Sequence, residues 1–167
     1  EIGSIDAKRN VGSPEHSLKL SAALGEAKQA RECAAMLPAA FNFAKVGPSG
    51  CRELSALDRL WCEIRRLIPQ TTELVAVAYA DHSTAGCPPP ERILARAAED
   101  GFGKILIDTF DKSGGSAVQH MGFDRLSDFG AAAQKMGFWW ALAGSVRLED
   151  LGELRTNLGT HGNFPAC

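Results

Sequence analysis

The sequence predicts an α/β protein with a parallel β-sheet, because short apolar segments alternate with amphipathic ones along the chain. The clearest strand signal lies in Lys104–Gly115, where the apolar run Ile105–Ile107 is followed at once by Asp108. A short apolar run bounded by glycines is typical of a strand buried on both faces, although periodicity alone also allows a buried helix. The connections between segments are short enough for the right-handed crossovers that join parallel strands.

Composition and charge limit the class of protein. The 167 residues are 45% hydrophobic and 23% charged, with a formal net charge of −2, which predicts one soluble globular domain over residues 1–167. The near-neutral charge argues against nucleic-acid binding, and no apolar stretch approaches the ~20 residues of a membrane span. The five cysteines form no C-x-x-C pair and the four histidines show no ligand spacing, so we expect free thiols, no metal and a cytoplasmic location.

Strands are predicted where short apolar runs end at a polar residue or a glycine. The segment Phe41–Val46 alternates in polarity and Leu74–Tyr79 is apolar throughout, and both patterns fit strands. The predicted strands, in chain order, are Glu1–Lys8, Leu18–Leu24, Phe41–Val46, Leu74–Tyr79, Lys104–Asp108 and Phe138–Ala143.

Helices are predicted between these strands. Five large apolar residues from Leu54 to Ile68 recur at helical spacing, and Pro69 ends that helix. Pro90 is accepted in the first turn of the next helix, and Gly101 closes it. The predicted helices are Ala27–Leu37, Leu54–Ile68, Glu91–Glu99, Asp124–Met136 and Leu148–Leu154, with loop composition in Asn10–Ser17 and a glycine-rich end from Asn157 to Cys167.

Polar or small residues follow one predicted strand after another, which favours a TIM (β/α)8-type barrel over other α/β folds. A barrel draws its active site from the carboxyl ends of several strands, and here these ends carry Lys8, Lys45, Asp81, Asp108 and Gly144–Ser145. No G-x-G-x-x-G or Walker loop follows a strand, so nucleotide-binding doubly wound folds lose support. A barrel typically needs ~250 residues, and we therefore expect this one to be incomplete at its N-terminal end.

These strand ends carry the groups that Schiff-base chemistry requires. An amine attacks a carbonyl only when it is neutral, a state that burial or a neighbouring cation favours. Lys8 and Lys45 are candidate nucleophiles, and further lysines would bind phosphate as point charges. Asp6 and Asp108 could move protons or orient the amine, and Gly144–Ser145 offers backbone N–H groups to an oxyanion. The plainer alternative for Asp108–Lys112 is an ordinary surface turn after a strand.

Five short segments occur in order at plausible separations: I-D-A-K at 5–8, A-K-V-G at 44–47, Y-A-D at 79–81, I-D-T-F-D-K-S-G at 107–114 and A-L-A-G-S at 141–145. Together they resemble the (5-formylfuran-3-yl)methyl phosphate synthase family, also known as 4-(hydroxymethyl)-2-furancarboxaldehyde-phosphate synthase. The resemblance covers most of the chain from Leu20 onward. It implies a β/α-barrel lyase of methanofuran biosynthesis, or its relative in methylotrophic bacteria. Such an enzyme condenses two molecules of glyceraldehyde 3-phosphate into a phosphorylated furan aldehyde, with loss of phosphate and water and without metal or organic cofactor.

The resemblance also implies roles for individual residues. Lys8 looks like the Schiff-base lysine with Asp6 as its neighbour, and Lys45 matches the lysine of the A-K-V-G strand. Asp108 matches the acid–base carboxylate and Lys112 the lysine of the loop after it. Asp81 is a lesser candidate for substrate binding, and Gly144 and Ser145 would hold a substrate phosphate. The implied partner is a phosphosugar, with no nucleic acid and no membrane, and a homo-oligomer is expected by analogy with barrel enzymes of this kind.

The chain departs from the family pattern at both ends. The family's first strand is absent, and loop-like residues replace the helix expected after I-D-A-K, so we expect either a truncated front or a gap across Arg9–Leu18. Near the other end the family's V-R-G-A-x-C becomes Thr160–Cys167, which removes an arginine expected to bind phosphate. Two further hypotheses therefore stay open: a catalytically degenerate barrel that binds phosphosugars, and another Schiff-base lyase or isomerase of phosphosugars.

Overall fold

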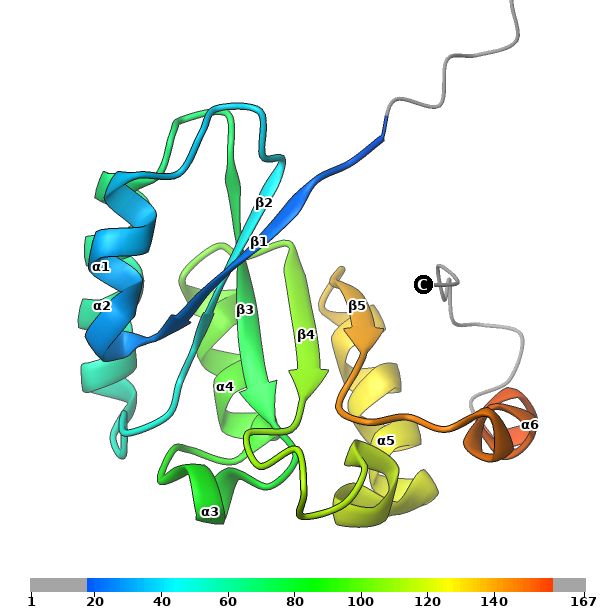
Figure 1. Cartoon of the computed structure of the whole chain (residues 1–167). Helices are drawn as coiled ribbons and strands as arrows, with labels where there is room; N and C mark the ends of the chain where they lie inside the picture. Colours follow the sequence, from blue (N-terminus) through cyan, green and yellow to red (C-terminus); the bar gives the residue numbers. More distant parts are fainter. Residues whose placement is uncertain (1–17, 158–167) are drawn as a thin grey trace, which may run out of the picture.

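A computed structural model describes residues 18–157. Over that range strands and helices alternate, with two helices between the third strand and the fourth (Figure 1). The strands are β1 (Ser21–Glu26), β2 (Phe43–Gly47), β3 (Glu73–Tyr79), β4 (Lys104–Asp108) and β5 (Trp139–Leu142). The helices are α1 (Ala27–Ala35), α2 (Leu54–Leu67), α3 (His82–Ala85), α4 (Pro90–Glu99), α5 (Ala117–Lys135) and α6 (Leu148–Asn157).

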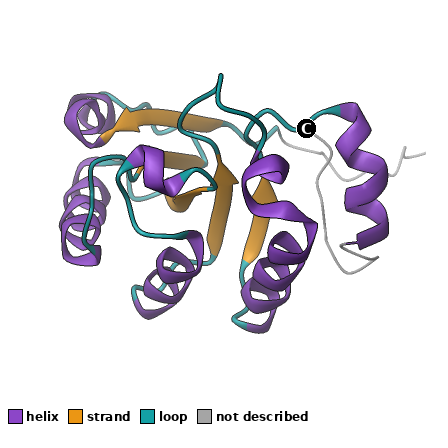
Figure 2. Ribbon diagram, turned by 90° about the horizontal axis from the view of Figure 1, so that it is seen from below, coloured by secondary structure: helices purple, strands orange, loops and turns teal. Residues whose placement is uncertain are grey.

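The five strands form one parallel sheet in the order β1-β2-β3-β4-β5. The sheet is curved, and the long helices α1, α2, α4 and α5 line its outer side (Figure 2). A doubly wound sheet reverses its strand order and carries helices on both faces, whereas here each strand lies beside the previous one. The structure thus confirms an α/β fold with a parallel sheet and successive β/α units, and the sheet is open between β1 and β5 within residues 18–157.

The outer face of the sheet carries the main core. Successive strand residues point to opposite faces, so that Ala44, Ala76 and Ile105 face the helices and are fully buried. The helices present the apolar stripe that the sequence predicts, including Leu57 and Trp61 of α2. The alternate residues of the same strands therefore face the inner side of the curve, where Ala85 of α3 packs with Val77 and Tyr79 of β3.

The predicted elements between residues 18 and 157 all occur, and their ends differ by a few residues, with two exceptions. The predicted loop after β3 contains the short helix α3, and α5 begins at Ala117 rather than at Asp124. Ser116 caps that helix in a reciprocal capping box with Gln119, and Gly122 interrupts it with φ 74° and ψ 161°. The predicted strand Glu1–Lys8, the loop Asn10–Ser17 and most of the glycine-rich end lie outside the described residues. No helix of residues 18–157 combines the length and apolarity needed to cross a membrane.

Candidate active site

A pocket of about 260 Å³ opens on the inner side of the sheet, at the carboxyl ends of β1 to β4. Each of these four strands ends on a residue that lines the pocket: Glu26, Gly47, Tyr79 and Asp108. In parallel α/β folds this edge is where ligands bind and chemistry is done. The polar side chains of the lining belong to Glu26, Lys45, Tyr79, Asp108, Thr109 and Lys112.

Lys45 reaches the pocket because of the alternation along β2. Its neighbours Ala44 and Val46 are buried against the helices, so the lysine side chain leaves the opposite face. In the strand register it stands between Ala23 of β1 and Val75 of β3. Among residues 18–157 it has no hydrogen-bond or ion-pair partner, so its amine is available to a ligand.

Asp108 and Lys112 meet at the rim of the pocket. Lys112 Nζ lies 2.6 Å from Asp108 Oδ1 and donates a second hydrogen bond of 2.6 Å to the carbonyl oxygen of Thr109. The Thr109 N–H also donates to Asp108 Oδ1, at 2.8 Å. The segment after β4 is thus a tight turn, as the plainer interpretation of the sequence has it, and this turn folds its lysine back onto the strand end beside the pocket.

Asp81 anchors this turn through hydrogen bonds to its backbone. The residue is 6% exposed and follows β3, and its two carboxylate oxygens accept the N–H groups of Phe110 and Asp111 at 2.8 and 2.9 Å. It is not among the residues that line the pocket. The predicted substrate-binding residue therefore has a visible structural role as the anchor of the turn that carries Lys112.

Gly144 and Ser145 form the turn between β5 and α6. Gly144 has φ +83°, and a Cβ there would lie 2.8 Å from the backbone nitrogen of Thr109, so that only glycine allows this close approach to the end of β4. Ser145 also has a positive φ, of 54°. The turn abuts Asp108 and Thr109, but neither of its residues lines the pocket. Asp6 and Lys8, the remaining predicted site residues, lie outside the described residues.

The structure adds two residues that the sequence interpretation missed, Glu26 and Tyr79. Tyr79 Oη donates a hydrogen bond of 2.5 Å to Glu26 Oε1, and the Ser49 N–H donates to Glu26 Oε2 at 3.0 Å. Burial raises the pKa of Tyr79 far above its ordinary value, and the hydrogen bond to Glu26 and the charges of Glu26 and Asp108 raise it further. Both residues end a strand, so the rule that selected Asp108 could have selected them.

The thiols near the pocket are buried. Cys51 and Cys87 are free, and burial is the main cause that raises the pKa of both, for Cys87 to about 12 with a contribution from Asp81. Cys87 packs with Val77 and Tyr79 in a small apolar cluster on the inner side of the sheet. Among residues 18–157 no group of three or more His, Cys, Asp and Glu side chains is placed to hold a metal ion.

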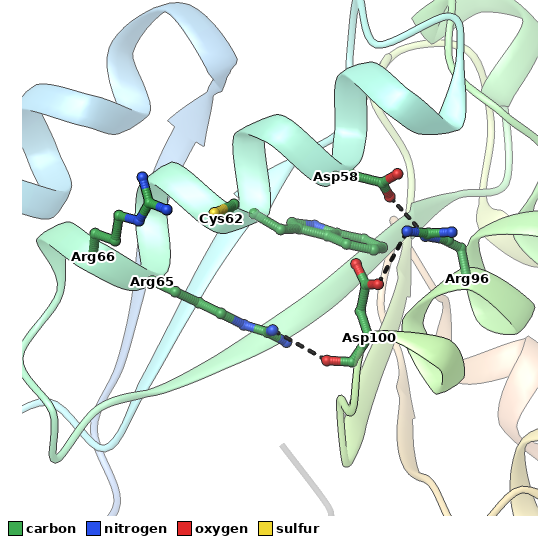
Figure 3. Close-up of a pocket in the computed structure, with 7 residues that line it drawn as sticks. Asp58, Cys62, Arg65, Arg66, Arg96 and Asp100 are labelled. Atoms are coloured by element: carbon green, nitrogen blue, oxygen red, sulfur yellow. Dashed lines mark hydrogen bonds and ion pairs between the residues drawn. The ribbon is translucent and has the colours of Figure 1, made fainter.

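A second pocket, of about 480 Å³, lies on the outer side between α2 and α4 (Figure 3). Arg96 pairs there with Asp58 at 2.8 Å and with Asp100 at 3.3 Å. Arg65 donates to the carbonyl oxygen of Asp100 at 3.1 Å and lies over the ring of Phe102. These contacts tie α2 to α4 and to the segment before β4, which indicates a structural network in the helical layer.

Amines and carboxylates gathered at the carboxyl ends of parallel strands define the class, an α/β protein whose candidate site lies at the carboxyl edge of a parallel sheet. Comparison with known proteins gives the family. The model of the 4-HFC-P synthase family matches residues 4–160, and the chain belongs to this family.

Relatives of the chain are named (5-formylfuran-3-yl)methyl phosphate synthase. It is 34% identical over 112 residues to the (5-formylfuran-3-yl)methyl phosphate synthase of Methanothermobacter thermautotrophicus, covering 66% of this chain and 48% of the relative. It is 31% identical over 152 residues to that of Methanococcus maripaludis strain C7, covering 86% and 64%. A putative (5-formylfuran-3-yl)methyl phosphate synthase of Kitasatospora aureofaciens is 31% identical over 122 residues, covering 71% and 48%. The chain thus spans about half the length of the first and third of these relatives and under two thirds of the second.

Proposed function

We propose that the protein is a furan phosphate synthase, a lyase that condenses two molecules of glyceraldehyde 3-phosphate through a lysine Schiff base. The product is 4-(hydroxymethyl)-2-furancarboxaldehyde phosphate, formed with loss of phosphate and water, as a compound of a methanofuran-type pathway. The observation that carries the proposal is the convergence of Lys45, Asp108 and Lys112 on one pocket, in a chain of this family.

The proposal divides the work among the residues of the pocket. Lys8 forms the Schiff base with a substrate carbonyl and Asp6 orients it, on the strength of the family resemblance. Lys45 contributes a second amine from an apolar wall, where its interaction with an anionic substrate is only weakly screened. Lys112 binds phosphate as a point charge, and Asp108 moves protons once substrate draws Lys112 away from it.

We also propose that the open arc is part of a closed β/α barrel. The consecutive strand order and the helices on the outer side support closure, since five adjacent β/α units already follow the curve of a barrel (Figure 2). Hydrogen–deuterium exchange tests it in the full chain. A closed ring predicts slow exchange for N–H groups of β1 and β5 alike, whereas fast exchange along either strand would argue for a free sheet edge.

The catalytic proposal is tested by trapping the Schiff base. Borohydride added with glyceraldehyde 3-phosphate should leave a covalent adduct on Lys8, identified by peptide mass spectrometry. Lys45→Met should reduce product formation strongly. The matched control is Lys28→Met, which removes an exposed lysine of α1 on the outer layer and should change neither trapping nor product. Binding of the triose phosphate by calorimetry without any lysine adduct, in a folded protein, would favour the degenerate phosphosugar-binding barrel instead.

A further inference from the structure

Glu26 and Tyr79 form a hydrogen-bonded pair that lines the pocket. The two residues end β1 and β3, the strands on either side of β2, and their side chains meet across Gly47, the last residue of β2. A Cβ at Gly47 would collide with both carboxylate oxygens of Glu26 and with the hydroxyl of Tyr79. Glycine at this position is therefore what allows the 2.5 Å hydrogen bond.

Hydrogen-bond donors fix the orientation of the pair. The Ser49 N–H donates to Glu26 Oε2 and the Tyr79 hydroxyl donates to Glu26 Oε1. The phenol is therefore the donor of the pair and the carboxylate is the acceptor. The Tyr79 oxygen keeps its lone pairs for a hydroxyl of a ligand in the pocket. The raised pKa of Tyr79 means that no tyrosinate accumulates, and the phenol can pass a proton on without losing one to solvent.

The two carboxylates at this rim have different surroundings. Asp108 is paired with the Lys112 ammonium at 2.6 Å, which offsets its charge. Glu26 accepts hydrogen bonds from two neutral donors, and within residues 18–157 no cation forms an ion pair with it. Of the two, Glu26 is the carboxylate that has a hydroxyl rather than an ammonium as its side-chain partner.

We infer that Tyr79 and Glu26 form a relay that removes the proton from the substrate hydroxyl that closes the furan ring, an inference that rests on the proposed function. A furan ring requires a C–O bond between a hydroxyl oxygen and a carbonyl carbon of the condensed six-carbon chain. As that bond forms, the substrate O–H bond breaks and its proton bonds to Tyr79 Oη, while the proton of Tyr79 bonds to Glu26 Oε1. The carbonyl π pair moves to its own oxygen, which takes a proton from water and leaves hydroxide. Glu26 later returns its proton to the hydroxyl that leaves as water, and the hydroxide takes a ring C–H proton, whose electron pair forms the furan double bond.

Tyr79→Phe tests the relay, because it keeps the ring that packs against Phe110, with centroids 5.8 Å apart, and removes only the hydroxyl. Positioned acid–base groups typically contribute about 10²–10⁴-fold, so kcat should fall at least ~100-fold with KM changed little. Glu26→Gln keeps the size and one acceptor oxygen and should show a similar fall. The double variant should be no slower than the slower single variant, since the two residues act as a unit. Glu32→Gln, at an exposed site on α1, is the control and should leave kcat unchanged.

Two readouts separate the relay from a structural role and from failure of the proposed function. Borohydride should still trap the lysine adduct in Tyr79→Phe, and the trapped unit should be an open six-carbon chain. The dependence of kcat on the deuterium fraction of the solvent should curve in the wild type, where two protons move together, and become linear in Tyr79→Phe. A wild type that traps no adduct would refute the proposed function itself. Normal trapping with unchanged kcat in folded Tyr79→Phe, or a trapped three-carbon unit, would refute the relay alone.

Discussion

Asp81 offers the sharpest test of how the candidate site is held together. Its carboxylate is 6% exposed and accepts two backbone N–H groups, those of Phe110 and Asp111, at 2.8 and 2.9 Å. Replacement by alanine leaves both donors without an acceptor at the base of the turn that carries Lys112. Hydrogen bonds to a charged group contribute about 1.5–3 kcal/mol each, and water can reach the exposed Phe110 side of the turn.

We therefore expect Asp81→Ala to lower the free energy of unfolding by about 2–4 kcal/mol, somewhat less than the sum of two such bonds. For a domain of this size that corresponds to a fall in Tm of roughly 4–16 °C. Asp81→Asn keeps one acceptor oxygen and should lose about half as much. Urea unfolding followed by circular dichroism measures the change.

The control is Asp128→Asn, which alters an exposed carboxylate on α5 and should change the free energy of unfolding by less than about 0.5 kcal/mol. Limited proteolysis provides a second readout, since loss of the anchor should open residues 109–114 to cleavage. Wild-type stability in Asp81→Ala, with only the affinity for triose phosphate reduced, would refute the anchor and return Asp81 to the role of a plain substrate ligand.

Three further predictions concern packing and ionisation. Gly130→Ala places a Cβ 2.7 Å from the Trp140 ring, and overpacking of this kind should cost about 1–3 kcal/mol in urea unfolding. The single tyrosine of the chain, Tyr79, has a raised pKa, so tyrosinate absorbance should appear only as the protein unfolds. Because the unfolded chain releases that proton near pH ~10, stability should fall as pH rises above that value, and a tyrosine that titrates at its ordinary pKa in the folded protein would contradict the buried hydrogen bond. A thiol reagent at neutral pH should label the exposed cysteines and spare Cys51 and Cys87, and rapid labelling of either would contradict its burial.

The order of strands and helices could be predicted because it depends on local sequence patterns, namely apolar runs, helical spacing and the positions of glycine and proline. The strand Lys104–Asp108 was predicted with the bounds that the structure shows, and α2 differs from its prediction by a single residue at its end. The start of α5 was missed because Gly122 breaks the helical φ/ψ and apolar periodicity, so the signal that remained was the capping pair Ser116 and Gln119. Such a capping box is visible in sequence and could have been used.

The site could be predicted only in part. Alternation along β2 sends Lys45 away from the buried Ala44 and Val46, and the strand end fixes Asp108, so both follow from sequence. The same strand-end rule could have pointed to Glu26 and Tyr79 singly. It could not show that two residues 53 positions apart share a hydrogen bond.

The sequence by itself determined the alternation of strands and helices, the face on which each strand side chain lies and the family to which the chain belongs, because each depends on neighbours along the chain. The tertiary structure alone decided which strand ends meet. Parallel register brings the side chains of Glu26 and Tyr79 together beside Gly47. It also places the Asp81 carboxylate where it accepts a backbone N–H of the turn that carries Lys112. Those contacts depend on distances between segments, which periodicity and composition do not encode.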